Sequence, residues 1–340
     1  MTENPEQALV DGYGRRISYL RVSVTDRCNL RCVYCMPEQG IDLAPMAEIL
    51  SYEEIRRVVE VAAPMGLRHV RLTGGEPLAR KGVVDLVRMI AAVPGIEEVT
   101  LTTNGVSLAR HAHALAEAGL RRVNVSLDTF RPDRFKQITR VGRYEDVMEG
   151  IEAASAAGLR PIKLNVVLIP SLNDDEALDF AASTLDKDWE VRFIELMPFL
   201  PSESCARDTT GSAGYVPNEV VRRRIEEHLG PLLPAETETG NGPAEYYRLE
   251  GAAGRIGFIS PLSGEDFCSR CNRLRLTADG RLRPCLLTDR EVDVKAALRG
   301  EGGDDAVRLA ILRALEIKPD SHHVNDGDRP VHRSMIEIGG

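Results

Sequence analysis

Residues 19–37, YLRVSVTDRCNLRCVYCMP, place a short apolar strand directly before three closely spaced cysteines. Outward from this stretch, the same unit of strand, turn and amphipathic helix repeats up to residue 198. The alternation requires parallel strands joined by crossover helices, in a doubly wound sheet or an incomplete barrel. We predict strands at residues 19–25, 69–73, 98–103, 123–128, 161–169 and 190–197, with helices that include 52–65, 108–118, 144–157 and 174–185.

The pattern changes after Met197. A loop rich in Pro, Ser and Gly precedes a charged helix, and an Asp-Gly pair at 279–280 is a strong signal for a hairpin turn. The remaining chain is a mixture of short strands and helices. We predict helices at 218–229, 294–298 and 304–315, and strands at 246–249 and 255–259.

The composition is that of a globular protein. The 340 residues are 43% hydrophobic and 28% charged, and the net charge is −9, which does not suit a protein whose whole surface binds nucleic acid. No apolar run approaches the roughly 18 residues of a membrane helix, and the N-terminal residues do not resemble a secretion signal. We therefore expect a cytoplasmic protein without nucleic-acid or membrane partners.

Seven cysteines, an odd number, indicate metal ligation or catalysis rather than a disulfide framework. Three of them, Cys28, Cys32 and Cys35, lie within eight residues at the end of the first strand. A structural zinc site needs four ligands, and the nearest histidine, His69, belongs to the next strand. Three thiolates can instead hold three corners of one iron–sulfur cluster.

This motif, CxxxCxxC with Tyr34 before its third cysteine, resembles the signature of the radical S-adenosylmethionine enzymes. The resemblance implies a [4Fe–4S] cluster on the first triad, with one iron open to S-adenosylmethionine. Strand two ends in LTGGEP, residues 72–77, which looks like the segment that binds the methionyl amino group. The implied contacts with S-adenosylmethionine are Tyr34, Gly75, Ser126 and Met197.

A second cysteine triad, Cys268, Cys271 and Cys285, lies near the C-terminus. Its spacing alone favours a zinc ribbon completed by His322 or His323. The whole segment FCSRCNRLRLTADGRLRPCL, residues 267–286, instead resembles the MoaA-type GTP 3′,8-cyclases of molybdenum cofactor biosynthesis. That resemblance runs from the first triad through LTGGEP and RFIELMP to the terminal Gly-Gly.

For the fold, the resemblance implies an α/β chain with an incomplete (β/α)6 TIM-like barrel over residues 15–230. A C-terminal α+β domain, residues 231–340, would close the open side of the barrel and carry a second [4Fe–4S] cluster. Arg273 and Arg275 would act in catalysis, together with Gly339 and Gly340 in a strand-like tail threaded into the barrel mouth. The implied GTP ligands, expected mostly at strand ends, are Arg21, Arg71, Thr102, Lys163, Arg192, Arg273 and Arg275.

Physical chemistry agrees with this set, because arginine forks and lysine ammonium groups bind phosphate oxygens. The implied reaction takes the 3′ hydrogen of GTP, joins C3′ to C8 of guanine and gives (8S)-3′,8-cyclo-7,8-dihydroguanosine 5′-triphosphate. The implied partners are an external one-electron donor and a separate cyclic pyranopterin monophosphate synthase. Either a monomer or a homodimer is expected.

Two rival functions remain open from the sequence. Another radical enzyme with an auxiliary cluster, such as a peptide maturase, would share the first triad, although such enzymes usually have more auxiliary cysteines. A zinc-stabilised nucleic-acid-binding protein would use the same cysteines, but the chain lacks interleaved aromatic and basic residues. Cys205 has no partner in the sequence and is assigned no role.

Overall fold

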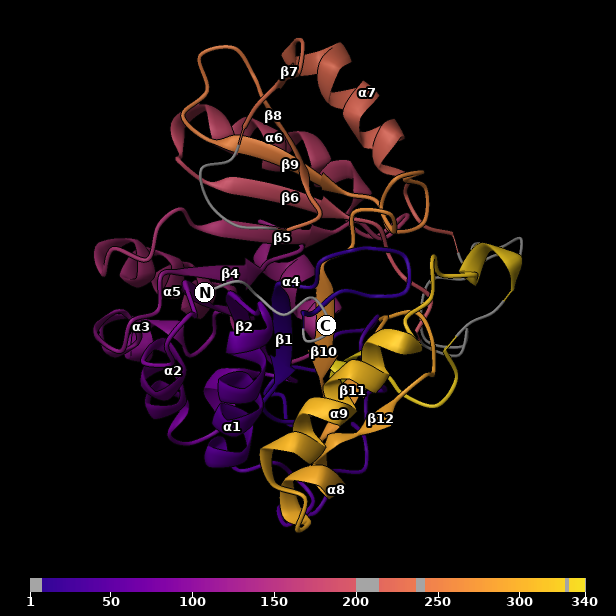
Figure 1. The fold of residues 1–340 in the computed structure, drawn as a ribbon. Coiled ribbons are helices and arrows are strands. Elements are labelled where there is room, and N and C mark those ends of the chain that lie inside the picture. Colours follow the sequence, from indigo (N-terminus) through magenta and orange to yellow (C-terminus); the bar gives the residue numbers. More distant parts are fainter. Residues whose placement is uncertain (1–7, 200–213, 237–241, 328–329, 340) are drawn as a thin grey trace.

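The computed structural model describes residues 8–199, 214–236, 242–327 and 330–339. Over these residues the strands form one sheet of twelve, in the order β12-β11-β10-β1-β2-β3-β4-β5-β6-β9-β8-β7 (Figure 1). The strands are β1 (Tyr19–Ser23), β2 (His69–Thr73), β3 (Glu98–Thr103), β4 (Arg122–Ser126), β5 (Lys163–Val167), β6 (Glu190–Ile194), β7 (Leu233–Pro234), β8 (Glu245–Arg248), β9 (Arg255–Ile259), β10 (Arg273–Leu276), β11 (Arg281–Arg283) and β12 (Val292–Asp293).

Strands β1 to β6 pair in parallel in chain order. Their residues are buried almost throughout, as expected for parallel strands with one face on the barrel interior and the other under helices. Figure 1 shows α1, α2, α3 and α5 grouped outside β1–β4. The helices are α1 (Tyr52–Ala62), α2 (Val83–Ala91), α3 (Leu108–Glu117), α4 (Pro132–Thr139), α5 (Tyr144–Ala156), α6 (Ala177–Asp186), α7 (Asn218–Leu229), α8 (Val294–Arg299), α9 (Gly303–Glu316) and α10 (Met335–Ile338).

Local sequence explains where several helices begin and end. Ser51 accepts a hydrogen bond from the backbone N–H of Glu54, whose side chain bonds back to Ser51 and completes a capping box before α1. The turns after α1 and α3 end at Gly66 and Gly119, with φ of 113° and 98°. Glycine adopts this left-handed conformation more easily than other residues. Gly66 and Gly119 therefore explain why the helical segments before them end where the sequence predicts.

The chain after residue 230 extends both edges of the barrel sheet. Strand β10 pairs in parallel with β1, and β9 pairs in parallel with β6. The two outermost strands, β12 and β7, do not pair with each other in the described structure, so the barrel is unclosed. The predicted fold class, an incomplete TIM-like barrel with C-terminal α+β elements, is confirmed. The division at residue 230 stays a prediction.

Some predicted elements differ from the observed ones. The strands predicted at 161–169 and 190–197 stop at Val167 and Ile194, because the residues beyond them turn into loops at the barrel mouth and leave the ladder. The tail is a short helix, α10, rather than a strand, since Ser334 and Glu337 form a capping box that starts a helical turn. Among the described residues, no helix has both the length and the apolar character needed to cross a membrane.

Candidate functional site

The first triad lies on the loop that follows β1. The backbone N–H groups of Cys35 and Met36 both bond to the carbonyl of Cys32, at 3.0 and 3.2 Å, and the N–H of Leu30 bonds to the Cys28 sulfur at 3.4 Å. Burial first, and then the neighbouring thiol of Cys35, raises the pKa of Cys32 well above its usual value. Buried thiols that repel each other's negative charge ionise readily only when a metal supplies positive charge. The donor set of three sulfurs therefore fits an iron–sulfur cluster.

Two side chains that the sequence analysis missed hold this loop. Arg140, directly after α4, donates from Nη1 to the carbonyls of Arg31 at 2.9 Å and Met36 at 3.2 Å. Asn104, directly after β3, donates to Asn29 Oδ1 at 2.7 Å and contacts the Cys28 sulfur at 3.8 Å. Both come from elements distant in sequence, so the local motif gives no signal for them.

The LTGGEP segment packs against the cysteine loop. A Cβ atom on Gly75 would lie 2.3 Å from the carbonyl oxygen of Arg27, so only glycine fits beside the peptide that precedes Cys28. Glu76 is buried, and its carboxylate accepts hydrogen bonds from Thr103 Oγ1 at 2.8 Å and from the N–H of Asn104 at 2.7 Å. Burial raises the pKa of Glu76 to about 7. Glu76 thus ties the end of β2 to the end of β3.

A small cavity beside the first triad contains two of the predicted cofactor contacts, Tyr34 and Ser126, together with Cys32. The Tyr34 hydroxyl donates to Asp128 Oδ2 at 2.7 Å, and the backbone N–H of Val167 donates to Asp128 Oδ1 at 2.8 Å. Burial raises the pKa of Asp128 to about 6. Asp128, two residues after the end of β4, is a site residue that was not predicted from the sequence.

A larger cavity lies inside the barrel, with about 1100 Å³ of empty space counted out to its open mouth. Arg275, Arg21 and Arg71 are register neighbours across β10, β1 and β2, and all three side chains line it. They come from within the strands rather than from the strand ends predicted for Arg21 and Arg71, because inward-facing positions occur along the whole length of a barrel strand. The lining also includes Arg192, Met197, Arg273 and the second triad, Cys268, Cys271 and Cys285.

The arginines make this cavity strongly electropositive. Burial first, and then the charge of Arg275, lowers the pKa of Arg21 to about 9. Burial likewise lowers the pKa of Arg71 to about 9 and that of Arg275 to about 10. The guanidinium groups stay protonated near neutral pH, so these shifts express first the cost of burying each charge and then the repulsion between neighbouring arginines. A bound polyanion would relieve that cost.

The second triad sits at the wall of the same cavity. Burial acts to raise the pKa of Cys271, but the charges of Arg273 and Lys318 lower it to about 6. A thiol ionised this easily is a good metal ligand, and the three sulfurs again suit an iron–sulfur cluster. His322 Nε2 bonds to the Pro261 carbonyl, and His323 pairs with Asp320 and Asp326. In the described part of the chain, no group of three or more His, Cys, Asp or Glu is arranged to hold a single metal ion.

Two predicted GTP ligands, Thr102 and Lys163, are absent from the described lining of the arginine cavity. Lys163 begins β5, so it lies at the amino end of its strand. It is buried, ion-paired with Glu190, and 3.2 Å from the hydroxyl of Tyr246. Thr102 faces Asn124 Nδ2 at 3.3 Å.

The described end of the tail reaches the cavity wall. The carbonyl of Gly339 accepts hydrogen bonds from Arg275 Nη1 at 3.2 Å and from Thr73 Oγ1 at 3.4 Å. Ile338 is buried in a small hydrophobic cluster with Phe199 and Leu262. Gly340 and Cys205, both named in the sequence analysis, lie outside the described residues.

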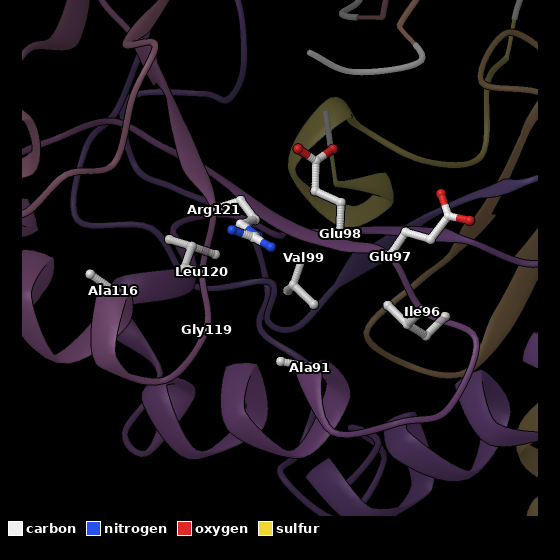
Figure 2. A pocket seen from close by; sticks show the side chains of 9 residues that line it. All are labelled: Ala91, Ile96, Glu97, Glu98, Val99, Ala116, Gly119, Leu120 and Arg121. Atoms are coloured by element: carbon white, nitrogen blue, oxygen red, sulfur yellow. The ribbon is translucent and has the colours of Figure 1, made fainter. Parts of the chain in front are cut away.

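Figure 2 shows a different cavity, of about 730 Å³ counted in the same way, with Glu97, Glu98 and Arg121 around it. It lies at the amino ends of β3 and β4, opposite to the cysteine loop. Its floor is formed by small apolar residues such as Ala91 and Ala116. Barrel enzymes carry their chemistry at the carboxyl ends of the strands, so this cavity is not the candidate site.

Comparison with known proteins agrees with this geometry. Residues 22–183 match the Radical SAM superfamily, and residues 189–324 match the family described as Molybdenum Cofactor Synthesis C. The GTP 3′,8-cyclase of Pelotomaculum thermopropionicum is 53% identical over 97% of this chain and 99% of its own length. The GTP 3′,8-cyclase of Moorella thermoacetica is 51% identical over the same shares of the two chains.

Among solved structures, Streptococcus suis SuiB bound to S-adenosylmethionine aligns with a TM-score of 0.59 at 12% identity. The alignment covers 85% of this chain but 65% of SuiB, so this chain spans less than two thirds of the length of SuiB. That likeness shows the fold. Because the identity to the cyclases extends over nearly its whole length, the chain belongs to the GTP 3′,8-cyclase family within the radical S-adenosylmethionine superfamily.

Proposed function

We propose that the protein cyclises GTP to (8S)-3′,8-cyclo-7,8-dihydroguanosine 5′-triphosphate with S-adenosylmethionine, as the first step of molybdenum cofactor biosynthesis. The observation that carries the proposal is one cavity that combines buried and partly buried arginines from β1, β2, β6 and β10 with three cysteines. The arginines suit a triphosphate, because they can neutralise its roughly four negative charges. The near full-length identity to relatives named GTP 3′,8-cyclase supports the same reaction.

Family membership implies an iron–sulfur cluster and S-adenosylmethionine. In our proposal Cys28, Cys32 and Cys35 hold that cluster as [4Fe–4S], while Tyr34 and Ser126 contact S-adenosylmethionine. When bound and given one electron by the external donor, the two would supply a 5′-deoxyadenosyl radical and methionine. Gly75, which packs against the cysteine loop, and Met197, which lines the arginine cavity, would also contact S-adenosylmethionine.

The second triad, in this proposal, holds a second [4Fe–4S] cluster. Held by Cys268, Cys271 and Cys285 on the cavity wall beside Arg273, this cluster would help to bind the guanine base, while Arg21, Arg71, Arg192 and Arg275 would hold the triphosphate. Thr102 and Lys163 would complete the substrate contacts from deeper in the barrel. The protein side chains thus orient the nucleotide and exclude water, and proximity accounts for the selectivity of the ring closure.

A peptide maturase is the weaker alternative. SuiB, which has also been solved with a precursor peptide, shares the fold at 11–13% identity. The identity to the cyclases is about four times higher. An external one-electron donor, transfer of the product to a cyclic pyranopterin monophosphate synthase, and a cytoplasmic location stay predictions.

The direct test is anaerobic incubation of the reconstituted protein with GTP, S-adenosylmethionine and dithionite. We expect 5′-deoxyadenosine and a cyclised nucleotide to form in step with each other. Formation of 5′-deoxyadenosine without any GTP-derived product would reject GTP as the substrate.

Cysteine variants test the two cluster sites separately. Replacing Cys28, Cys32 and Cys35 by Ala should remove about four irons and abolish cleavage of S-adenosylmethionine, and replacing the second triad should remove a similar number. Cys205→Ala is the matched control and should lose no iron. Loss of all iron from either triple variant would contradict two independent sites, and zinc without iron in the anaerobic wild type would favour the binding-protein alternative.

Arginine variants test the nucleotide site. Arg273→Ala or Arg275→Ala should weaken GTP binding roughly 10- to 150-fold, because a charge-assisted contact contributes about 1.5–3 kcal/mol. Arg270→Ala is a suitable control, since Arg270 belongs to the same segment but is exposed and paired with Glu245. Unchanged GTP titrations for both cavity variants would place the nucleotide elsewhere.

A further inference from the structure

A buried lysine lies directly behind the second cysteine triad. Lys318 follows α9 and is 3% exposed. Its ammonium group donates three hydrogen bonds, to the Cys271 sulfur at 3.4 Å, to the Arg273 carbonyl at 3.0 Å and to the Pro284 carbonyl at 2.5 Å. An ammonium has three donors, so all of them are used.

The acceptors connect two separate parts of the triad. Arg273 lies two residues after Cys271, and Pro284 immediately precedes Cys285. Lys318 therefore fixes the spacing between Cys271, before β10, and Cys285, after β11. Of its three acceptors, only the Cys271 sulfur can carry a full negative charge. A buried cation without a negative partner is unfavourable, which makes the thiolate its natural counterion.

Arg15 supports Cys268, the remaining cysteine of the triad, in a different way. Its Nη1 donates to the Cys268 carbonyl at 2.8 Å and to the Asp320 carbonyl at 2.7 Å, while its Nε pairs with Asp11 at 2.6 Å. Arg15 thus links the same 318–322 segment to the triad, but through backbone carbonyls. Its charge is balanced by Asp11. Lys318 thus differs from Arg15 because it donates a hydrogen bond to a ligand sulfur.

The position of Lys318 also separates it from substrate binding. All three cysteines and Arg273 line the arginine cavity, whereas Lys318 is not part of its described lining. The ammonium contacts Cys271 from within the protein, so it stays at the sulfur whether or not the cavity is filled.

We propose that Lys318 is a positioning residue for the second iron–sulfur cluster, which it stabilises in its reduced form through the hydrogen bond to the Cys271 sulfur. The inference depends on the second cluster of the proposed function. Hydrogen bonds to ligand sulfurs and nearby positive charge both raise the reduction potential of such clusters, because reduction adds a negative charge. The contacts to Arg273 and Pro284 keep that charge at a fixed distance.

The test uses the full-length chain with Cys28, Cys32 and Cys35 replaced by Ala, so that only the second cluster contributes to the signal. In this background we compare Lys318→Met, Lys318→Arg and Arg15→Met by iron content and by redox titration followed by electron paramagnetic resonance. We expect Lys318→Met to shift the midpoint potential to more negative values, and Lys318→Arg to restore most of the shift. Arg15→Met should weaken cluster retention and shift the potential less than Lys318→Met does, because Arg15 bonds to the Cys268 carbonyl and not to a ligand sulfur.

An unchanged potential in Lys318→Met with normal iron content would overturn the proposal. So would an equal shift in Arg15→Met, because the effect would then be structural. If Lys318→Met retains no iron, the proposal requires Lys318→Arg to recover it, and equal iron loss in both variants would refute it. Absence of iron from the parent triple variant would instead reject the second cluster itself.

Discussion

The guanidinium of Arg275 on β10 donates a hydrogen bond, 3.2 Å long, to the carbonyl of Gly339, 64 residues later in the chain. The same carbonyl accepts the hydroxyl of Thr73 from the end of β2. The tail is held in this place by Arg333, which pairs with Asp279 at 2.8 Å, and by burial of Ile336 and Ile338. The orientation of one cavity arginine therefore depends on the last residues of the protein.

Gly339→Ala should abolish GTP cyclisation while both clusters and cleavage of S-adenosylmethionine stay largely intact. Gly339 has φ of 80°, and a Cβ there would lie 2.6 Å from Thr73 Oγ1 and 2.8 Å from the Cβ of Ser23. The tail must then move and release Arg275. Gly327→Ala is the matched control, since Gly327 has φ of 95° but no atom within 4 Å of a Cβ. Wild-type yield of cyclised nucleotide from Gly339→Ala would show that the tail contact is dispensable.

GTP binding should weaken as pH rises above 7, and Lys163 should account for part of that slope. Burial first, and then the charge of Arg192, lowers the pKa of Lys163 to about 7 from 10.5. Its charge is therefore lost as pH rises through 7, whereas a nearby polyphosphate favours the protonated form. Binding should take up a proton in this range, with at most about a tenfold loss of affinity per pH unit.

Isothermal titration calorimetry with GTP at about pH 6.5 and about pH 8.5 measures this slope in the wild type and in Lys163→Met. This range covers most of the loss of charge of a group that titrates near pH 7. We expect the variant to have a shallower slope and weaker binding at the lower pH. Equal slopes in the two proteins would mean that Lys163 does not sense the nucleotide.

Tyr34→Phe should lower the free energy of unfolding by about 1–3 kcal/mol, because it leaves buried Asp128 without the hydroxyl that it accepts from. Burial raises the pKa of Asp128 to about 6 and the Tyr34 bond opposes that rise. The folded chain therefore holds this proton more tightly than the unfolded chain, and stability falls as pH rises from about 4 to 6.

Without the Tyr34 hydroxyl the pKa of Asp128 rises further. The free energy of unfolding that Tyr34→Phe loses should therefore be larger at about pH 7 than at about pH 5. Chemical denaturation at both values, under anaerobic conditions, measures the difference. In an Asp128→Asn background this pH dependence should disappear. If the free energy of unfolding lost in Tyr34→Phe does not change with pH, the cause is lost packing and not a lost hydrogen bond to a carboxylate.

Glu195→Gln should destabilise the segment that leads to the second triad. The buried carboxylate of Glu195 accepts from the N–H groups of Asn218 at 3.1 Å, Leu262 at 3.0 Å and Ser263 at 3.1 Å. An amide nitrogen in place of one oxygen cannot accept, so some donors lose their partner at a cost of about 1–3 kcal/mol. We expect a lower midpoint of thermal unfolding and faster release of iron to a chelator. The exposed Glu265→Gln provides the control, and equal iron release from the two variants would contradict a supporting role for Glu195.

Local pattern predicted much of the barrel. The strands at 69–73 and 98–103 and the helix at 218–229 coincide with β2, β3 and α7, because alternating apolar residues and glycine ends are local signals. Helices α2 and α4 are not among the helices that were named from the sequence. In α2 the apolar stretch VVDLVRMIA is short and has no capping side chain at Gly82, so its helical period was easily missed.

Candidate ligands in local motifs were also predictable from the sequence, whereas contacts between distant residues were not. Cysteines separated by three and then two other residues indicate a metal-binding loop before the fold is known, and the arginines beside Cys271 indicate an anion site. The ion pair of Lys163 with Glu190 could not be read from the sequence. It depends on where β5 begins to pair with β4 and β6.

The sequence by itself determined the two cysteine triads, the glycine turn at 74–75 and the parallel α/β repeat, since each is a pattern of residue types and spacings along the chain. Only the tertiary structure decided which distant groups meet: Asp128 with Tyr34, Arg275 with Gly339, and Lys318 with Cys271. These contacts follow from the strand order, in which β10 inserts beside β1 at one edge and β9 beside β6 at the other. Strand order and register are set by packing of the whole sheet, which no local pattern of residues specifies.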